Sequence, residues 1–237
     1  MTVFRTISLA AVLAMGTAVA ASASSVTLRY DGPTAGSGLT DFDNVNIQVT
    51  PAGSTGNALA GGFDFSELQG NEVLRNFVAW CMDLSANLNQ GTRNYHESPS
   101  FITGVNELMG AGTRVQGLFD AVYHFVNPAD RVQSTAFQLA IWEVIYDDDY
   151  SLTSGSFRAA GTGTNGADVE ETARDWLDIA KGWSGTQKWS LTFYEASNPN
   201  QQNIGTASAI PLPAAGWLLL GGLGALGALA RRRKATA

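Results

Sequence analysis

Cys81 is the only cysteine in the 237-residue chain, so no disulfide can form within it. Its neighbours Ala79, Trp80, Met82 and Leu84 are apolar, and this pattern predicts that the thiol is buried. One interpretation is an inert thiol that packs as a small hydrophobic group. The other is a reactive thiol whose partner is not a second cysteine, as is suspected of an unpaired cysteine when a protein is secreted.

Gln138 is a candidate for that partner. It lies inside a strongly apolar segment, residues 137–145, whose spacing predicts a buried helix. A buried carboxamide must find hydrogen-bond partners or be changed chemically. A cysteine thiolate can attack the amide carbon of glutamine, expel ammonia and leave a thioester. Such a bond survives only where water is excluded.

Two short motifs carry these residues. The first is Trp80–Leu84, with Cys81 in second place, and the second is Gln138–Trp142. Both resemble the motifs of the thioester domains of bacterial surface adhesins, although Phe137 stands where that family usually has threonine. The resemblance extends in overall order over about residues 70–195. It implies an α+β domain in which Cys81 and Gln138 form a thioester.

The resemblance also implies a function. An amine on an unknown surface or matrix target attacks the thioester carbonyl at Gln138, Cys81 leaves as a thiolate, and an amide bond to the target remains. This is a single-use acylation without turnover, so we predict a covalent adhesin that is neither an enzyme nor in need of a cofactor. The best-known members of the family carry a different cell-surface anchor.

Three titratable residues are candidates for supporting this chemistry as a base or a proton donor: Asp83, His124 and Glu143. Each also has a purely structural interpretation. Asp83 could cap a turn, Glu143 could face solvent beside the apolar stripe of its helix, and His124 could be an ordinary helix residue.

The N-terminus has the order of a secretory signal peptide. A single positive charge at Arg5 precedes a short apolar run, and small residues follow up to Ala23. We therefore predict that residues 1–23 direct export and are removed. The alternative is an N-terminal membrane anchor, which the short apolar run disfavours.

The C-terminus, residues 210–237, combines a Pro-containing motif, an uncharged stretch long enough for a transmembrane helix, and a basic cluster. The motif consists of Ile210, Pro211, Leu212, Pro213 and Ala214. This segment resembles the PEP-CTERM sorting signals in their Val-Pro-Leu-Pro-Ala variant, with isoleucine in the first place. The resemblance implies cleavage by a membrane exosortase and delivery to the cell surface or extracellular matrix. The alternative is a plain membrane anchor, and both place the middle of the chain outside the cell.

The distribution of charged residues limits the kinds of binding partner. All 21 Asp and Glu residues lie within residues 24–209, whereas five of the 14 Lys and Arg residues lie in the two terminal segments. The middle of the chain therefore carries a net charge of −12. Such an acidic surface argues against nucleic acid as a partner, because the phosphates would be repelled.

Hydrophobic patterning predicts an α+β domain over residues 24–197, with a β-sandwich or barrel-like scaffold carrying a helical subdomain. Strands are expected at 26–30, 45–49, 61–65, 77–84 and 189–194. Helices are expected at 101–109, 114–126 and 131–146, and after a cap at Asp168. The polar composition of residues 198–209 predicts a linker to the sorting segment.

Other functions have weaker support. Asp147–Asp149 could bind calcium, but the segment lacks the pattern of an EF-hand loop, and a solvated acidic loop is the simpler interpretation. With two histidines and one cysteine, a zinc site is not expected, and we predict no metal site. A hydrolase motif is absent. The main alternative to a covalent adhesin is a non-covalent structural protein of the extracellular polysaccharide matrix with a buried free thiol.

Overall fold

The computed structural model describes residues 24–34, 43–49, 55–101 and 109–210. The predicted signal peptide and the sorting segment after Ile210 lie outside these residues, as does most of the helix expected at 101–109. Among the described residues, no helix is both long and apolar enough to cross a membrane.

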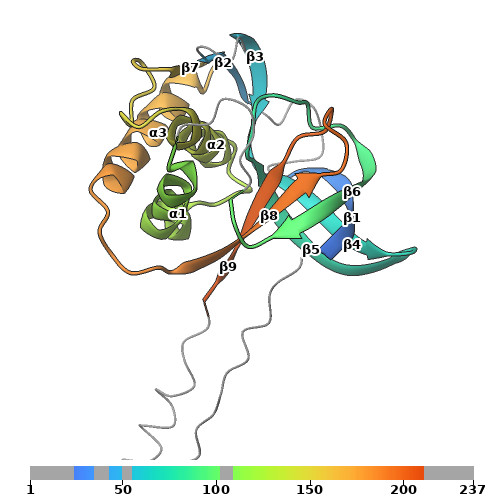
Figure 1. Cartoon of the computed structure of the whole chain (residues 1–237). Helices are drawn as coiled ribbons and strands as arrows, with labels where there is room; N and C mark the ends of the chain where they lie inside the picture. The colour runs from blue at the N-terminus through green and yellow to red at the C-terminus, as the bar shows by residue number, and fades with distance from the viewer. Residues whose placement is uncertain (1–23, 35–42, 50–54, 102–108, 211–237) are drawn as a thin grey trace, which may run out of the picture.

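Six antiparallel strands form a closed barrel in the order β1-β4-β5-β9-β8-β6 (Figure 1). Its strands are β1 (Ser24–Pro33), β4 (Phe63–Gln69), β5 (Glu72–Cys81), β6 (Gly91–Ser98), β8 (Trp189–Ala196) and β9 (Ile204–Ala209). Inward-facing Leu28, Phe65, Tyr95 and Tyr194 are almost fully buried. Strand β5 pairs with β9 only at Trp80 and Cys81, so closure rests on the end of β5 that carries Cys81.

A second sheet has the order β3-β2-β7, with β2 (Asp43–Val49) in the centre, β3 (Thr55–Ala60) on one side and β7 (Phe157–Gly161) on the other. Three helices lie beside it: α1 (Ala111–Val122), α2 (Arg131–Tyr146) and α3 (Gly166–Lys181), with a short 3-10 turn η1 (Tyr123–Phe125) after α1. The predicted α+β class, a barrel-like scaffold carrying a helical part, is confirmed.

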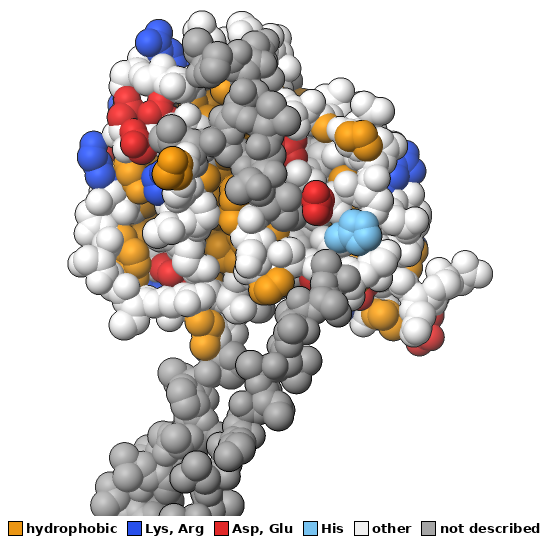
Figure 2. Space-filling view, in the orientation of Figure 1, with side chains coloured by type: hydrophobic (Ala, Val, Ile, Leu, Met, Phe, Trp, Pro, Cys, Tyr) orange, Lys and Arg blue, Asp and Glu red, His pale blue; other side chains and the backbone are white. Residues whose placement is uncertain are grey.

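Helix α2 is the centre of the helical part. Every residue from Ser134 to Tyr146 is buried, as expected for a helix covered on all sides. Asp130 begins it, because its carboxylate accepts a hydrogen bond from the Gln133 N–H at 2.9 Å. By contrast α3 is amphipathic, burying Val169, Ala173, Trp176 and others at helical spacing. Figure 2 shows one group of acidic side chains beside Lys or Arg at the upper left, over the helical part, with other acidic side chains scattered over the face in view.

Two predicted boundaries are wrong. The segment 198–209 is not a linker, because residues 204–209 form β9 and close the barrel between β5 and β8. Its Gly, Thr, Ala and Ser residues conceal the strand pattern, although Ile204 is fully buried. Asp168 does not cap α3. The N-cap is Asn165, and Asp168 lies in the first turn, where its charge interacts favourably with the helix dipole.

Candidate functional site

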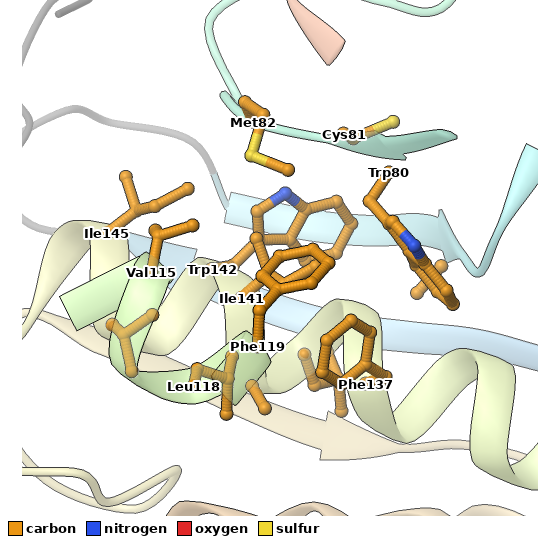
Figure 3. Close-up of a cluster of buried hydrophobic side chains, with 14 of the residues drawn as sticks. Trp80, Cys81, Met82, Val115, Leu118, Phe119, Phe137, Ile141, Trp142 and Ile145 are labelled. Carbon is orange, nitrogen blue, oxygen red and sulfur yellow. The ribbon is translucent and has the colours of Figure 1, made fainter. Parts of the chain in front are cut away.

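Cys81 is the last residue of β5 and pairs with Ile204 of β9. Its side chain is 2% exposed. Figure 3 shows the flanking side chains, Trp80 and Met82, directed toward the helices, while the Cys81 sulfur is directed away from them. This alternation is the ordinary geometry of a strand. The ring of Trp80 packs edge-on against Phe137 at 4.8 Å between centroids, which fixes β5 against α2.

Gln138 comes from α2 and is fully buried. Its Oε1 accepts a hydrogen bond from the Cys81 N–H at 2.9 Å, and its Nε2 donates to the Cys81 carbonyl oxygen, also at 2.9 Å. Strand β4 begins at Phe63, opposite Ala79, so no strand residue pairs with this edge of Cys81. The carboxamide of Gln138 continues the ladder where β4 has ended.

Two further polar residues of α2 bind neighbouring backbone in the same way. The Gly62 N–H donates to Ser134 Oγ at 2.8 Å, and Thr135 Oγ1 donates to the Ala60 carbonyl at 3.0 Å. Ser134, Thr135 and Gln138 therefore form a buried polar row that joins α2 to the strand ends. Ser134 and Thr135 were not predicted as part of the site, although polar residues in an otherwise apolar helix are a signal for it.

Asp83 lies two residues beyond Cys81 and is 3% exposed. Its carboxylate accepts hydrogen bonds from the Asn203 N–H at 2.9 Å and from the N–H and hydroxyl of Ser85 at 3.1 Å. Burial raises the pKa of Asp83, and these hydrogen bonds oppose the rise. Asp83 thus holds the turn after β5 in place, and its carboxyl lies close enough to Cys81 to influence the thiol electrostatically.

The thiol itself is poorly ionised. Burial raises the pKa of Cys81 well above its ordinary value, and the negative charge of Asp83 adds to the rise. A thiol in this environment is protonated at neutral pH, so it reacts only if its proton is removed or transferred during the reaction.

A pocket of about 450 Å³ opens beside Cys81. It lies between the barrel, strand β3 and the segment 84–90, and Tyr30, Phe63, Trp142 and Gln202 line it with Cys81. None of its described lining residues is charged. Trp142 lines the pocket, and its indole Nε1 is buried without a hydrogen-bond partner among the described residues.

The other two predicted supporting residues lie elsewhere. Glu143 follows Gln138 by five positions on α2, which places it about 7.5 Å further along and about 140° around the helix. It does not face solvent: it is fully buried and accepts a hydrogen bond from the Ser151 N–H at 2.8 Å. Burial, followed by the charges of Asp147 and Asp149, raises the pKa of Glu143 to about 9.

His124 lies in η1 and is exposed. Its ring packs against that of Phe125 with 3.7 Å between centroids and a tilt of 41°. Partial burial and the positive charge of Lys188 lower the pKa of His124. Of the sorting motif only Ile210 is described, and its N–H donates to the Lys188 carbonyl at 3.2 Å. The structure therefore brings Cys81, Gln138 and Asp83 together and leaves His124 and Glu143 apart from them.

No family model and no curated protein matches the sequence. Solved structures with a similar fold include the N-terminal domain of the Streptococcus pyogenes pilus tip adhesin Cpa (14% identity, TM-score 0.42, covering 74% of this chain and 97% of that one). They also include the N-terminal thioester domain of a Clostridium perfringens surface protein (11%, 0.39, 70% and 99%). A third is the N-terminal thioester domain of the fibronectin-binding protein SfbI from S. pyogenes (12%, 0.41, 74% and 97%). These similarities are too distant to assign the chain to a family.

Proposed function

We propose that this chain is an exported surface or matrix protein that attaches covalently to its target through a Cys81–Gln138 thioester. The observation that carries the proposal is the pairing of the Gln138 carboxamide with the backbone of Cys81, at 2.9 Å for both hydrogen bonds, in a buried site. The export and sorting steps, including processing by an exosortase-like enzyme, are supported by the two terminal sequences.

The hydrogen bonds of the pair support the chemistry. The Cys81 N–H that binds Gln138 Oε1 would stabilise the negative charge that forms on this oxygen when sulfur attacks the amide carbon. Rotation about the Cα–Cβ bond of Cys81 would bring the sulfur toward that carbon, since a cysteine has three staggered positions. In forming the thioester, the C–S bond replaces the C–N bond and the thiol proton leaves with the nitrogen as ammonia.

In the second step the thioester bond is broken by the target. A target amine attacks the thioester carbon at Gln138, loses a proton, and forms an amide, while Cys81 recovers a proton as the thiol. The neutral pocket beside Cys81 favours an uncharged, nucleophilic amine over an ammonium ion, because burying the charge without a partner is costly. Asp83 is the candidate to accept the proton of the amine and to return it to Cys81, since its buried carboxyl acts electrostatically on the thiol.

Intact mass of the purified protein tests this proposal. We expect the wild type to be lighter than its sequence by one ammonia and Cys81→Ala to have its full mass. Methylamine should add to the wild type at residue 138, with the thiol becoming titratable after unfolding. A wild-type mass equal to the sequence, with glutamine at position 138 in a peptide map, would refute the thioester. Glutamate at that position would instead mark a thioester that had hydrolysed.

A second function has one observation in its favour. The two hydrogen bonds to Cys81 already satisfy Gln138 without any covalent change, and the sulfur is directed away from α2. A non-covalent structural protein of the extracellular matrix would have this arrangement with an unmodified thiol. The same mass measurement separates the two functions.

A further inference from the structure

Three carboxyl groups meet where α2 ends. Glu143 lies in the last turn of the helix, and Asp147 and Asp149 follow it; we call these three residues the acidic cluster. Each offers an oxygen, and these oxygens all lie within 4.8 Å of one another. Because Ca²⁺ binds oxygen at about 2.4 Å, two oxygens on one ion are at most about 4.8 Å apart. All three carboxylates can therefore share a single ion.

The acidic cluster has an unsatisfied member. Glu143 is fully buried and Asp147 is 7% exposed. Oε1 of Glu143 accepts a hydrogen bond from the Ser151 N–H, but its Oε2 is buried with no hydrogen-bond partner. A buried carboxylate oxygen without a partner is costly, so a positive charge or a proton is needed there.

Within the described part of the chain, no basic side chain forms an ion pair with these carboxylates. The amino group of Lys181 is nearby, but it donates to the main-chain oxygen of Asp149 at 3.0 Å. The carbonyls at the end of α2 add partial negative charge to the same region.

The cluster is also held in position. The Asp147 carboxylate accepts hydrogen bonds from the N–H groups of Asp148 at 2.8 Å, Phe157 at 3.2 Å and Ser156. Gly155 lies against this carboxylate with φ +73°, and a Cβ there would be 1.8 Å from Asp147 Oδ2. Only glycine allows the loop to close around Asp147 in this way.

We propose that the acidic cluster binds one hard divalent cation, Ca²⁺ in the first instance, through Glu143 Oε2 and oxygens of Asp147 and Asp149. Main-chain carbonyls and water would complete the six to eight oxygen ligands that Ca²⁺ prefers. The ion would neutralise the buried carboxylate and fasten the loop 147–157 to α2. This site is independent of the thioester, because it lies on the other side of the helix from Gln138.

Thermal unfolding of the full chain, stripped of metal with a chelator, tests the site. Adding Ca²⁺ to one hundred times its Kd should raise the Tm by roughly 5–10 °C. The rise should be lost in Glu143→Gln, which keeps the side-chain shape and the acceptor for Ser151. Asp149→Asn is the second variant, in case the first fails to fold. Asp148→Asn is the matched control, because Asp148 is exposed in the same loop and outside the cluster.

Two results would overturn the proposal. One is an equal Ca²⁺ response in all four proteins, which would indicate general screening of an acidic surface. The other is a wild type indifferent to Ca²⁺ that gains stability on acidification, with the gain abolished by Glu143→Gln. In that case a proton shared between Glu143 and Asp149 takes the place of the ion.

Discussion

The Gln138 carboxamide binds a strand edge and is also the electrophile of the proposed reaction. Its two hydrogen bonds to Cys81 align the amide carbon with the residue whose sulfur must reach it. Formation of the thioester would remove one of these two hydrogen bonds, since the donor Nε2 leaves as ammonia. The Cys81 carbonyl oxygen then loses its hydrogen bond from residue 138, while the Cys81 N–H still donates to the acyl oxygen of that residue.

At the residue scale, we expect the unpartnered indole N–H of Trp142 to affect the rate at which the thioester captures an amine. Trp142 lines the pocket one helical turn after Gln138, and its buried N–H has no partner among the described residues, so we expect it to donate to an oxygen of the reacting acyl group. Trp142→Phe removes this donor, so we expect capture of methylamine to slow by about tenfold or more. The ammonia deficit in the intact mass should remain. Trp183→Phe, whose ring instead packs with Lys188, should react at the wild-type rate; equal rates in both variants would remove Trp142 from the reaction.

At the scale of elements, the polar row of α2 determines how the helix docks on the strand ends. Ser134→Ala leaves the buried Gly62 N–H without its acceptor, so we expect a loss of about 1–3 kcal/mol in the free energy of unfolding. Urea denaturation measures this loss. The control is Ser190→Ala on β8, whose side chain is exposed, and it should change stability by less than about 0.5 kcal/mol. Equal stability of the two variants would contradict the docking role of Ser134.

Sequence patterns identified the elements that have a clear apolar period and missed those built from small residues. Helix α2 was predicted at its observed bounds because Phe137, Ile141, Val144 and Ile145 form an apolar stripe. Strands β3, β6 and β7 escaped prediction because Thr55–Ala60, Gly91–Ser98 and Phe157–Gly161 contain mainly small or polar residues. Strands β3 and β7 depend on pairing with β2, and β6 depends on pairing with β1 and β8, which local sequence does not encode.

Part of the candidate site was predictable from residue type. Cys81 and Gln138 stand out by residue type, and the structure places them in contact. That they form a thioester stays a prediction. The burial of Glu143 was not predictable, because it depends on the loop 147–157 folding back over the end of α2. The hydrogen bond by which Asn203 holds Asp83 joins residues 120 positions apart in the chain, which local sequence does not encode.

At the scale of the whole molecule, β9 closes the barrel and also supports the site. A chain ending at Asn198 lacks β9, which opens the barrel between β5 and β8 and removes the bonds of Gln202 and Asn203 to Asp83. We expect this chain to lose cooperative thermal unfolding and to be digested rapidly by protease. A chain ending at Ile210 should unfold in one transition. The same transition in both chains would show that β9 is dispensable.

Strand β9 also runs from the proposed attachment site to the C-terminal end of the described chain. Ile204 pairs with Cys81 beside the site, while Ala209 lies at the far end of the strand, where the described chain leaves the barrel (Figure 1). If a target is joined to Gln138 and the chain is held through its C-terminus, tension enters at Ile210 and passes along the chain through β9, β8, α3 and β7 to α2. Pulling β9 along its axis loads its bonds to β5 and β8 in shear, so they must fail together rather than one after another. The barrel would then resist extension of the chain between Gln138 and Ile210, and β5, which precedes Gln138, would bear load only through its hydrogen bonds.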